Sequence, residues 1–137
     1  MLANVRATAK PINDVLRYEN QHLMERYAVD HHVSVDTARA RFFAFKQFMV
    51  VCASKPGAKV TSTEIDGIWH CFLLFTRDYR AFCEEYLGRF INHEPFHTPR
   101  PEAYDETRRF AEALFGELDH ELWPRSAKSD CSSGCDD

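Results

Sequence analysis

The 137-residue sequence has only five glycines and no long hydrophobic segment. A membrane span needs about 18 consecutive apolar residues, and no stretch approaches that length. The first residues, MLANVRATAKPIND, lack the apolar core of a signal peptide, which favours a cytoplasmic protein. Apolar and polar residues nowhere alternate with the period of a strand, and no segment repeats another. These absences argue against a membrane protein and against a β-rich fold.

Positive charge is also scarce. The chain has 17 Lys and Arg against 21 Asp and Glu, a formal net charge of -4. Nucleic-acid-binding surfaces concentrate positive charge, so the composition argues against a nucleic acid as partner. No phosphate-binding loop, cofactor motif or catalytic triad is recognisable.

The five cysteines do not form a disulfide framework. Cys52, Cys71 and Cys83 lie within helical patterns and are typical of small buried residues. Cys131 and Cys135 lie in the polar segment SAKSDCSSGCDD. They are either idle thiols, a disulfide, a modification site, or metal ligands completed by a partner, because two thiols alone are too few for a structural zinc site.

The apolar content is high enough for one packed domain, at 45% hydrophobic residues with eleven Phe. Apolar residues recur with helical period in five regions. The sequence therefore predicts an all-α single domain, an irregular bundle of about five helices over residues 11–125. A flexible leader (residues 1–10) and a flexible Cys-containing tail (residues 126–137) are expected on either side. The predicted helices cover residues 12–28, 34–53, 63–75, 76–88 and 102–118, the third and fourth being one bent helix or two.

The segment EIDGIWHCFLLFTRDYRAFCEEYLGRFINHEPFH, residues 64–97, holds the polar residues most typical of a site. Asp66 and His70 are one helical turn apart and so share a face, at the edge of an apolar stripe that includes Trp69. Tyr79 continues that stripe if the helix runs on, and Arg77 then falls between Asp66 and His70 in angle. A carboxylate, an imidazole and a guanidinium would line one edge of a hydrophobic face.

Two further histidines, His93 and His97, flank Pro95 in a proline-rich loop. Such a loop can hold both imidazoles toward a neighbouring helix. With Asp66 and His70 they would form a mixed oxygen and nitrogen ligand set, which suits Zn²⁺, Fe²⁺ or Mn²⁺. Two other interpretations stay open: a structural Asp66–His70 pair, and a metal-free acid–base site.

A second candidate lies in the first predicted helix, where Glu19 falls within the apolar stripe and His22 lies at its edge. Glu-x-x-His pairs supply metal ligands in the cores of some helical bundles. A single copy is equally explained by a Glu paired with a buried Arg or Tyr, or by a rotated helix that lets both side chains reach water.

Three motifs of the chain together resemble the glycine-rich domain-containing protein family: Asp66-x-x-Trp69-His70, Thr76-x-x-Tyr79-x-x-x-Cys83 and His93-x-Pro95. The likeness covers roughly residues 60–97. It implies an RNA-binding or signalling role, as associated with plant members, although the chain has almost no glycine-rich region. Cys131-Ser-Ser-Gly-Cys135 resembles a remnant of the family's Gly/Cys-rich tail. The site residues that the resemblance implies are Asp66, Trp69, His70 and His93.

Two functions follow from the residues. The first is a small metal-binding protein, with or without metal-dependent catalysis, in which an open coordination position activates water and Trp69, Arg77 and Tyr79 shape access to it. The second is a non-catalytic protein–protein interaction module in which the Asp–His cluster is structural. The first predicts a small-molecule partner and the second a protein partner.

Overall fold

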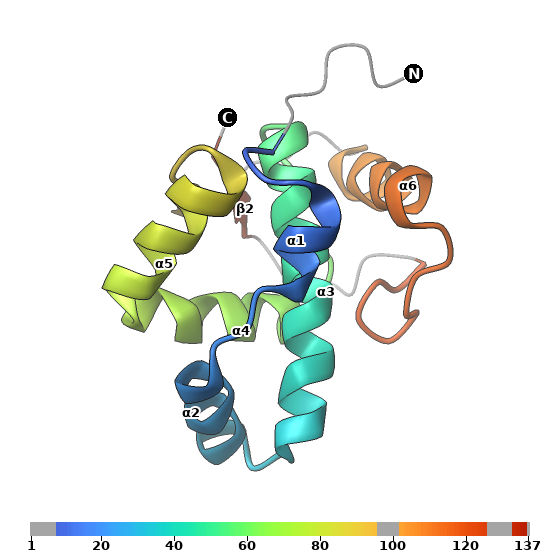
Figure 1. Ribbon diagram of the computed structural model, residues 1–137. Coiled ribbons are helices and arrows are strands. Elements are labelled where there is room, and N and C mark those ends of the chain that lie inside the picture. Colours follow the sequence, from blue (N-terminus) through green and yellow to red (C-terminus); the bar gives the residue numbers. More distant parts are fainter. Residues whose placement is uncertain (1–7, 96–101, 126–132, 137) are drawn as a thin grey trace.

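The structure, a computed structural model, describes residues 8–95, 102–125 and 133–136. Six α-helices and one very small sheet make up these residues, which confirms the prediction of an all-α single domain (Figure 1). No helix in these ranges is both long and apolar enough to cross a membrane. The elements are α1 (Ile12–Arg17), α2 (Gln21–His31), α3 (Val35–Ser54), α4 (Thr63–Leu74), α5 (Thr76–Phe82), the π-helical turn η1 (Cys83–Leu87), β1 (His93–Glu94), α6 (Ala103–Phe115) and β2 (Gly134–Cys135).

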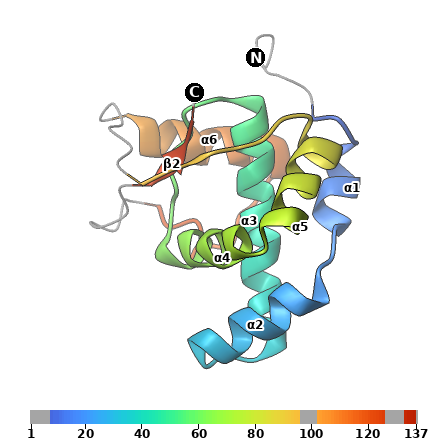
Figure 2. The same ribbon diagram turned by 90° about the vertical axis from the view of Figure 1, so that its left-hand side faces the viewer.

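The long helix α3 lies at the centre of the molecule and packs against α1, α2, α4, α6 and η1 (Figures 1 and 2). Every side chain from Ala44 to Ser54 is buried, so the second half of this helix is covered on all sides. A helix that is apolar nearly all round is expected to be buried in this way, because it offers no face to water. The other helices are therefore arranged around α3.

Aromatic side chains form the core between α3 and α4. The Trp69 ring of α4 lies against Phe45 and Phe48 of α3, with ring centroids 6.2 and 5.6 Å apart. Trp123, from the segment after α6, reaches the other side of Phe48 at 6.4 Å. Both tryptophans are fully buried. Truncating a buried Trp typically costs about 3–5 kcal/mol, so these contacts account for much of the attachment of α4 and of the α6 segment to α3.

The single helix predicted over residues 12–28 is wrong, because the chain leaves helical geometry at Tyr18–Asn20. Asn20 begins α2 as its N-cap, accepting a hydrogen bond from the Leu23 N–H at 3.1 Å. The end of α1 is capped from α3 by Lys46, whose buried ammonium donates to the carbonyls of Leu16 (2.6 Å) and Tyr18 (2.7 Å). A cap residue and a distant lysine thus replace the helical hydrogen bonds that the break removes.

The region 63–88 contains two helices rather than one bent helix. Ser62 is the N-cap of α4 and accepts from the Ile65 N–H at 3.2 Å. The helix ends at Phe75, whose φ of -91° and ψ of 63° are not helical, and α5 begins at the next residue. This break changes the direction of the chain between Asp66 and Arg77, so the helical-wheel relation predicted for them does not hold.

Residues 133–136 return to the helical domain and pair with two other segments. β2 is antiparallel to β1, with Cys135 opposite His93. On its other side, the Cys135 N–H donates to the Ala58 carbonyl at 3.0 Å, and the Val60 N–H donates to the Ser133 carbonyl at 2.9 Å. The sequence did not predict this pairing, because two-residue strands are too short to show alternation. Most of the predicted leader (residues 1–7) and tail (residues 126–132 and 137, including Cys131) lies outside the described residues.

Gly67 lies where α2 crosses α4, and an alanine fits there. A Cβ at this position would lie 3.6 Å from His31 Cε1 and 3.8 Å from the Tyr27 hydroxyl, which are ordinary contacts. Because Ala is favoured over Gly inside a helix, we expect Gly67→Ala to raise the free energy of unfolding by about 0.5–1 kcal/mol. Gly88→Ala should lower it by about 1 kcal/mol or more, because Gly88 has a φ of +94°. Urea denaturation measures both; a destabilised Gly67→Ala would contradict the contacts described.

The pH dependence of stability should report the burial of Lys46. Burial lowers the pKa of this ammonium to about 8, an effect that the nearby Glu19 carboxylate partly offsets. Between about pH 8 and the ordinary lysine pKa, the unfolded chain binds more protons at this residue, so its contribution to stability rises with pH. The stability of the wild type relative to Lys46→Met should therefore increase from pH 7 to pH 9, by up to about 1 kcal/mol. Urea unfolding of both proteins at the two pH values measures this, and a pH-independent difference would contradict it.

Candidate metal centre

Asp66, His70 and His93 meet in the structure, as the sequence predicted. His93 Nε2 lies 2.9 Å from Asp66 Oδ1 and 3.0 Å from His70 Nε2. His70 Nε2 lies 3.3 Å from Asp66 Oδ2. One donor atom from each side chain thus falls within a space that a single metal ion could occupy. The helical period places the first two residues, and β1 supplies the third.

Trp69 and Tyr79 position the segment that carries His93. The buried Trp69 indole donates to the Tyr79 hydroxyl at 3.0 Å, and this hydroxyl donates to the Ile91 carbonyl. Burial raises the pKa of Tyr79, so its hydroxyl stays protonated and keeps this donor role. The Trp69 ring also meets the His93 ring edge to face, with centroids 4.5 Å apart. The predicted site-lining residues Trp69 and Tyr79 therefore support His93 from the core side.

The last described residues hold the same segment from the opposite side. Asp136 accepts from both the backbone N–H of Asn92 (3.3 Å) and its side-chain amide (2.9 Å). Asp136 also pairs with Arg89 at 3.6 Å. His93 is consequently fixed between α4 and the C-terminal strand. This support could not be predicted from sequence patterns, because Asp136 lies 44 residues from Asn92 and in a polar segment.

The cluster is closed on one side and open on the other. The His93 side chain is 9% exposed and Asp66 is 18% exposed, whereas His70 is 56% exposed. The core side is apolar and formed by Trp69. An ion held by these three residues would therefore have free coordination positions on the His70 side, where water or a small molecule can reach it.

The two imidazole nitrogens and the carboxylate compete for hydrogen bonds within the cluster. Each Nε2 carries either one proton or one lone pair in the plane of its ring. With Asp66 as acceptor, two protonated nitrogens face each other at 3.0 Å. If one of the two nitrogens is unprotonated, its lone pair points toward the Asp66 carboxylate or toward the other imidazole. The single N–H of that other imidazole must then be shared between two acceptors. A cation bound by all three atoms removes this conflict, because every one of them then acts as a lone-pair donor.

The other predicted site residues lie elsewhere. Arg77 is exposed on α5 and is not part of the cluster, because the break at Phe75 changes the chain direction before it. Glu19 lies in the exposed linker between α1 and α2, and His22 is exposed on α2, so the pair does not project into a bundle core. His97 lies outside the described residues.

The comparison with protein families gives one match. The sequence model of the UCP032817-like family matches residues 13–115, about three quarters of the chain. The chain belongs to the UCP032817-like family. The matched range contains Asp66, His70 and His93, so the proposed ligands lie within the part of the chain that defines this uncharacterised family. No curated protein and no solved structure matches the chain.

This assignment overturns the resemblance to the glycine-rich domain-containing family, and with it the RNA-binding or signalling role that the resemblance implied. The structure gives a physical account of the motifs that suggested it. Trp69 and Tyr79 are hydrogen-bonded in the core, Cys83 is buried beside Tyr79, and His93 packs on Trp69. The motifs therefore describe one packing unit of this fold.

Removal of residues 133–137 should release His93 from its support. We expect faster amide exchange in residues 91–94 and a loss of about 1–3 kcal/mol in the free energy of unfolding, since the truncation removes β2 and the Asp136 contacts. Asp136→Ala, which keeps the strand pairing, should show a smaller effect in the same residues. Hydrogen exchange read by mass spectrometry measures both, and unchanged exchange in residues 91–94 of the truncated chain would contradict the supporting role.

Proposed function

We propose that this protein binds a divalent transition metal through one carboxylate oxygen of Asp66 and the Nε2 atoms of His70 and His93. The observation that carries the proposal is the close approach of the three side chains. The two Nε2 atoms lie 3.0 Å apart, and the carboxylate approaches His93 Nε2 with Oδ1 at 2.9 Å and His70 Nε2 with Oδ2 at 3.3 Å. Four ligands at about 2.0–2.1 Å around a tetrahedral Zn²⁺ lie about 3.3–3.4 Å from one another. A small outward movement of the side chains would therefore accommodate the ion.

The ligand set favours Zn²⁺, Fe²⁺ or Mn²⁺. Two imidazoles and one carboxylate with open positions are used by catalytic zinc sites and by non-haem Fe²⁺ sites. The cluster contains no thiolate, so it is unlike a closed structural zinc site. His97, four residues after His93, remains the predicted fourth ligand or acid–base group. A cytoplasmic location also remains a prediction.

A metal at this position would coordinate water or a small molecule that reaches the exposed side of the cluster. A bound Zn²⁺ lowers the pKa of a coordinated water and polarises carbonyl or phosphoryl oxygens. Asp66, His70 and His93 would hold the ion, while Trp69 excludes water from the core side. Hydrolysis of a small molecule is the reaction class that fits such a half-open site, and it depends on the metal proposal.

The second candidate function is a non-catalytic interaction module with a structural Asp–His cluster. It is favoured by the burial of His93, its packing on Trp69 and its contact with Asp66, since these interactions attach β1 to α4 without an ion. In that case Asp66 and His93 matter for stability, and the exposed His70 contributes little.

His70 separates the two functions, because it is more than half exposed and its removal leaves the core intact. In untagged protein we expect near-stoichiometric Zn²⁺ or Mn²⁺ binding by calorimetry, and loss of affinity by about 100-fold or more in His70→Ala. Saturating metal at about 100 times Kd should also raise the free energy of unfolding by about 2.7 kcal/mol. His22→Ala is the matched control, an exposed histidine outside the cluster, and should bind like wild type.

Equal binding by His70→Ala and His22→Ala, or no metal in the untagged wild type by elemental analysis and calorimetry, would contradict the metal site. Under the structural alternative, metal has no effect on unfolding. Asp66→Ala then lowers stability, while His70→Ala leaves it nearly unchanged.

A further inference from the structure

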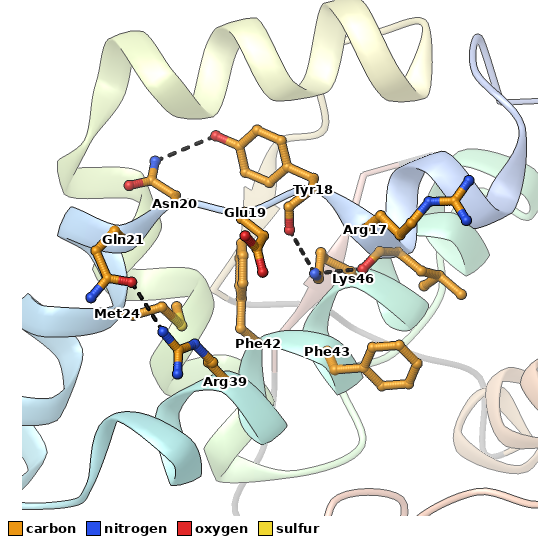
Figure 3. A pocket seen from close by; sticks show the side chains of 11 residues that line it. Arg17, Tyr18, Glu19, Asn20, Gln21, Met24, Arg39, Phe42, Phe43 and Lys46 are labelled. Carbon is orange, nitrogen blue, oxygen red and sulfur yellow. Dashed lines mark hydrogen bonds between the residues drawn. The ribbon is translucent and has the colours of Figure 1, made fainter.

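A pocket lies away from the Asp–His cluster, where the linker between α1 and α2 crosses α3. Its volume is about 550 Å³, within the range of small-molecule sites. Figure 3 shows its lining: the linker residues on one side and one face of α3 on the other. The pocket exists because the chain is not helical at Tyr18–Asn20, and it has no part in the proposed metal chemistry.

Four residues of α3 give this pocket its chemistry. They follow one another at positions i, i+3, i+4 and i+7, so they share one face of the helix. Two cations lie at the ends of this face and two aromatic rings lie between them. Phe42 is buried, whereas the Phe43 side chain is 46% exposed although it is a large apolar group. In chain order the four residues are Arg39, Phe42, Phe43 and Lys46.

Arg39 is available to a ligand. Its guanidinium contacts Gln21 Oε1 at 3.2 Å and forms an exposed ion pair with Asp36 Oδ1 at 3.4 Å, and its side chain is half exposed, so both contacts are made where water competes for them. Lys46 donates to two backbone carbonyls and its ammonium lies 4.7 Å from the centre of the Phe42 ring, so it adds positive charge beside the aromatic part of the pocket. Both groups favour an anion, and the arginine can bind a carboxylate through two parallel hydrogen bonds.

The Glu19 carboxylate favours a ligand with a single negative charge over a dianion. Its side chain also lines the pocket, and Figure 3 shows it beside Phe42 and Lys46. A dianion such as a phosphate ester would be repelled by this carboxylate more strongly than a monoanion. The geometry points to a small monocarboxylate with an aromatic or short aliphatic body, its carboxylate bound by Arg39 and its apolar part lying on Phe42 and Phe43.

An NMR titration of the full chain with benzoate tests this site. We expect saturable binding in the millimolar range, with amide shifts confined to residues 16–21 and 39–46. Benzamide has the same shape without the charge and should bind at least about fivefold more weakly. Phenyl phosphate should also bind more weakly than benzoate because of Glu19.

Substitutions of three exposed residues should change benzoate binding in different ways. Arg39→Gln should weaken benzoate binding about three- to tenfold and leave benzamide unchanged. Glu19→Gln should tighten benzoate binding about two- to threefold, because it removes the repelling charge. Arg26→Gln is the control, an exposed arginine on α2 that does not line the pocket, and should bind like wild type.

The site is disproved if benzoate does not saturate, if benzamide binds as well as benzoate, or if Arg39→Gln and Arg26→Gln weaken binding equally. Shifts centred on Asp66 and His93 would also disprove it, because they would place the carboxylate at the other cluster. Tighter binding of phenyl phosphate than of benzoate would overturn the monocarboxylate assignment.

Discussion

The rest of this structure depends on the packing of the buried Trp69 side chain. Its ring packs against Phe45 and Phe48 of α3 and against the His93 ring, and its N–H donates to the Tyr79 hydroxyl. A single side chain thus links the central helix, α5 and the segment that carries the third proposed ligand. The geometry of the Asp–His cluster is therefore coupled to the packing of the core, although the cluster itself lies at the surface.

The helical period explains which parts of the fold could be predicted. Asp66 and His70 share a turn of α4 because a four-residue spacing determines this in any helix, and the second half of α3 is buried because it is apolar nearly all round. The approach of His93 was predicted from its chemistry and from the loop that carries it. None of these inferences required knowledge of contacts between distant residues.

The wrong predictions arise at helix ends. There a capping residue or a non-helical residue ends a helix although the apolar pattern continues beyond it. Asn20 caps α2 and so removes Glu19 from the helix that was to pair it with His22. The non-helical Phe75 separates Arg77 from Asp66 in the same way. The support from Asp136 could not be predicted by such reasoning, since it comes from a distant two-residue strand. The helix break at Tyr18–Asn20 also has a constructive result, because it opens the pocket beside Arg39 and Phe43.

The pairing of β2 with β1 has a consequence for the order of folding. The contacts of Cys135 and Asp136 span 77 and 44 residues of chain, whereas the backbone hydrogen bonds inside each helix are local. Contacts of long sequence separation form late, because their loop-closure entropy is the largest. On the ribosome α1 to α5 can pack while the chain is still being made, whereas the hydrogen bonds between the segment of His93 and residues 133–136 form only after those residues have emerged. Under the metal proposal, the ligand His93 therefore gains its full support only at this late step of folding.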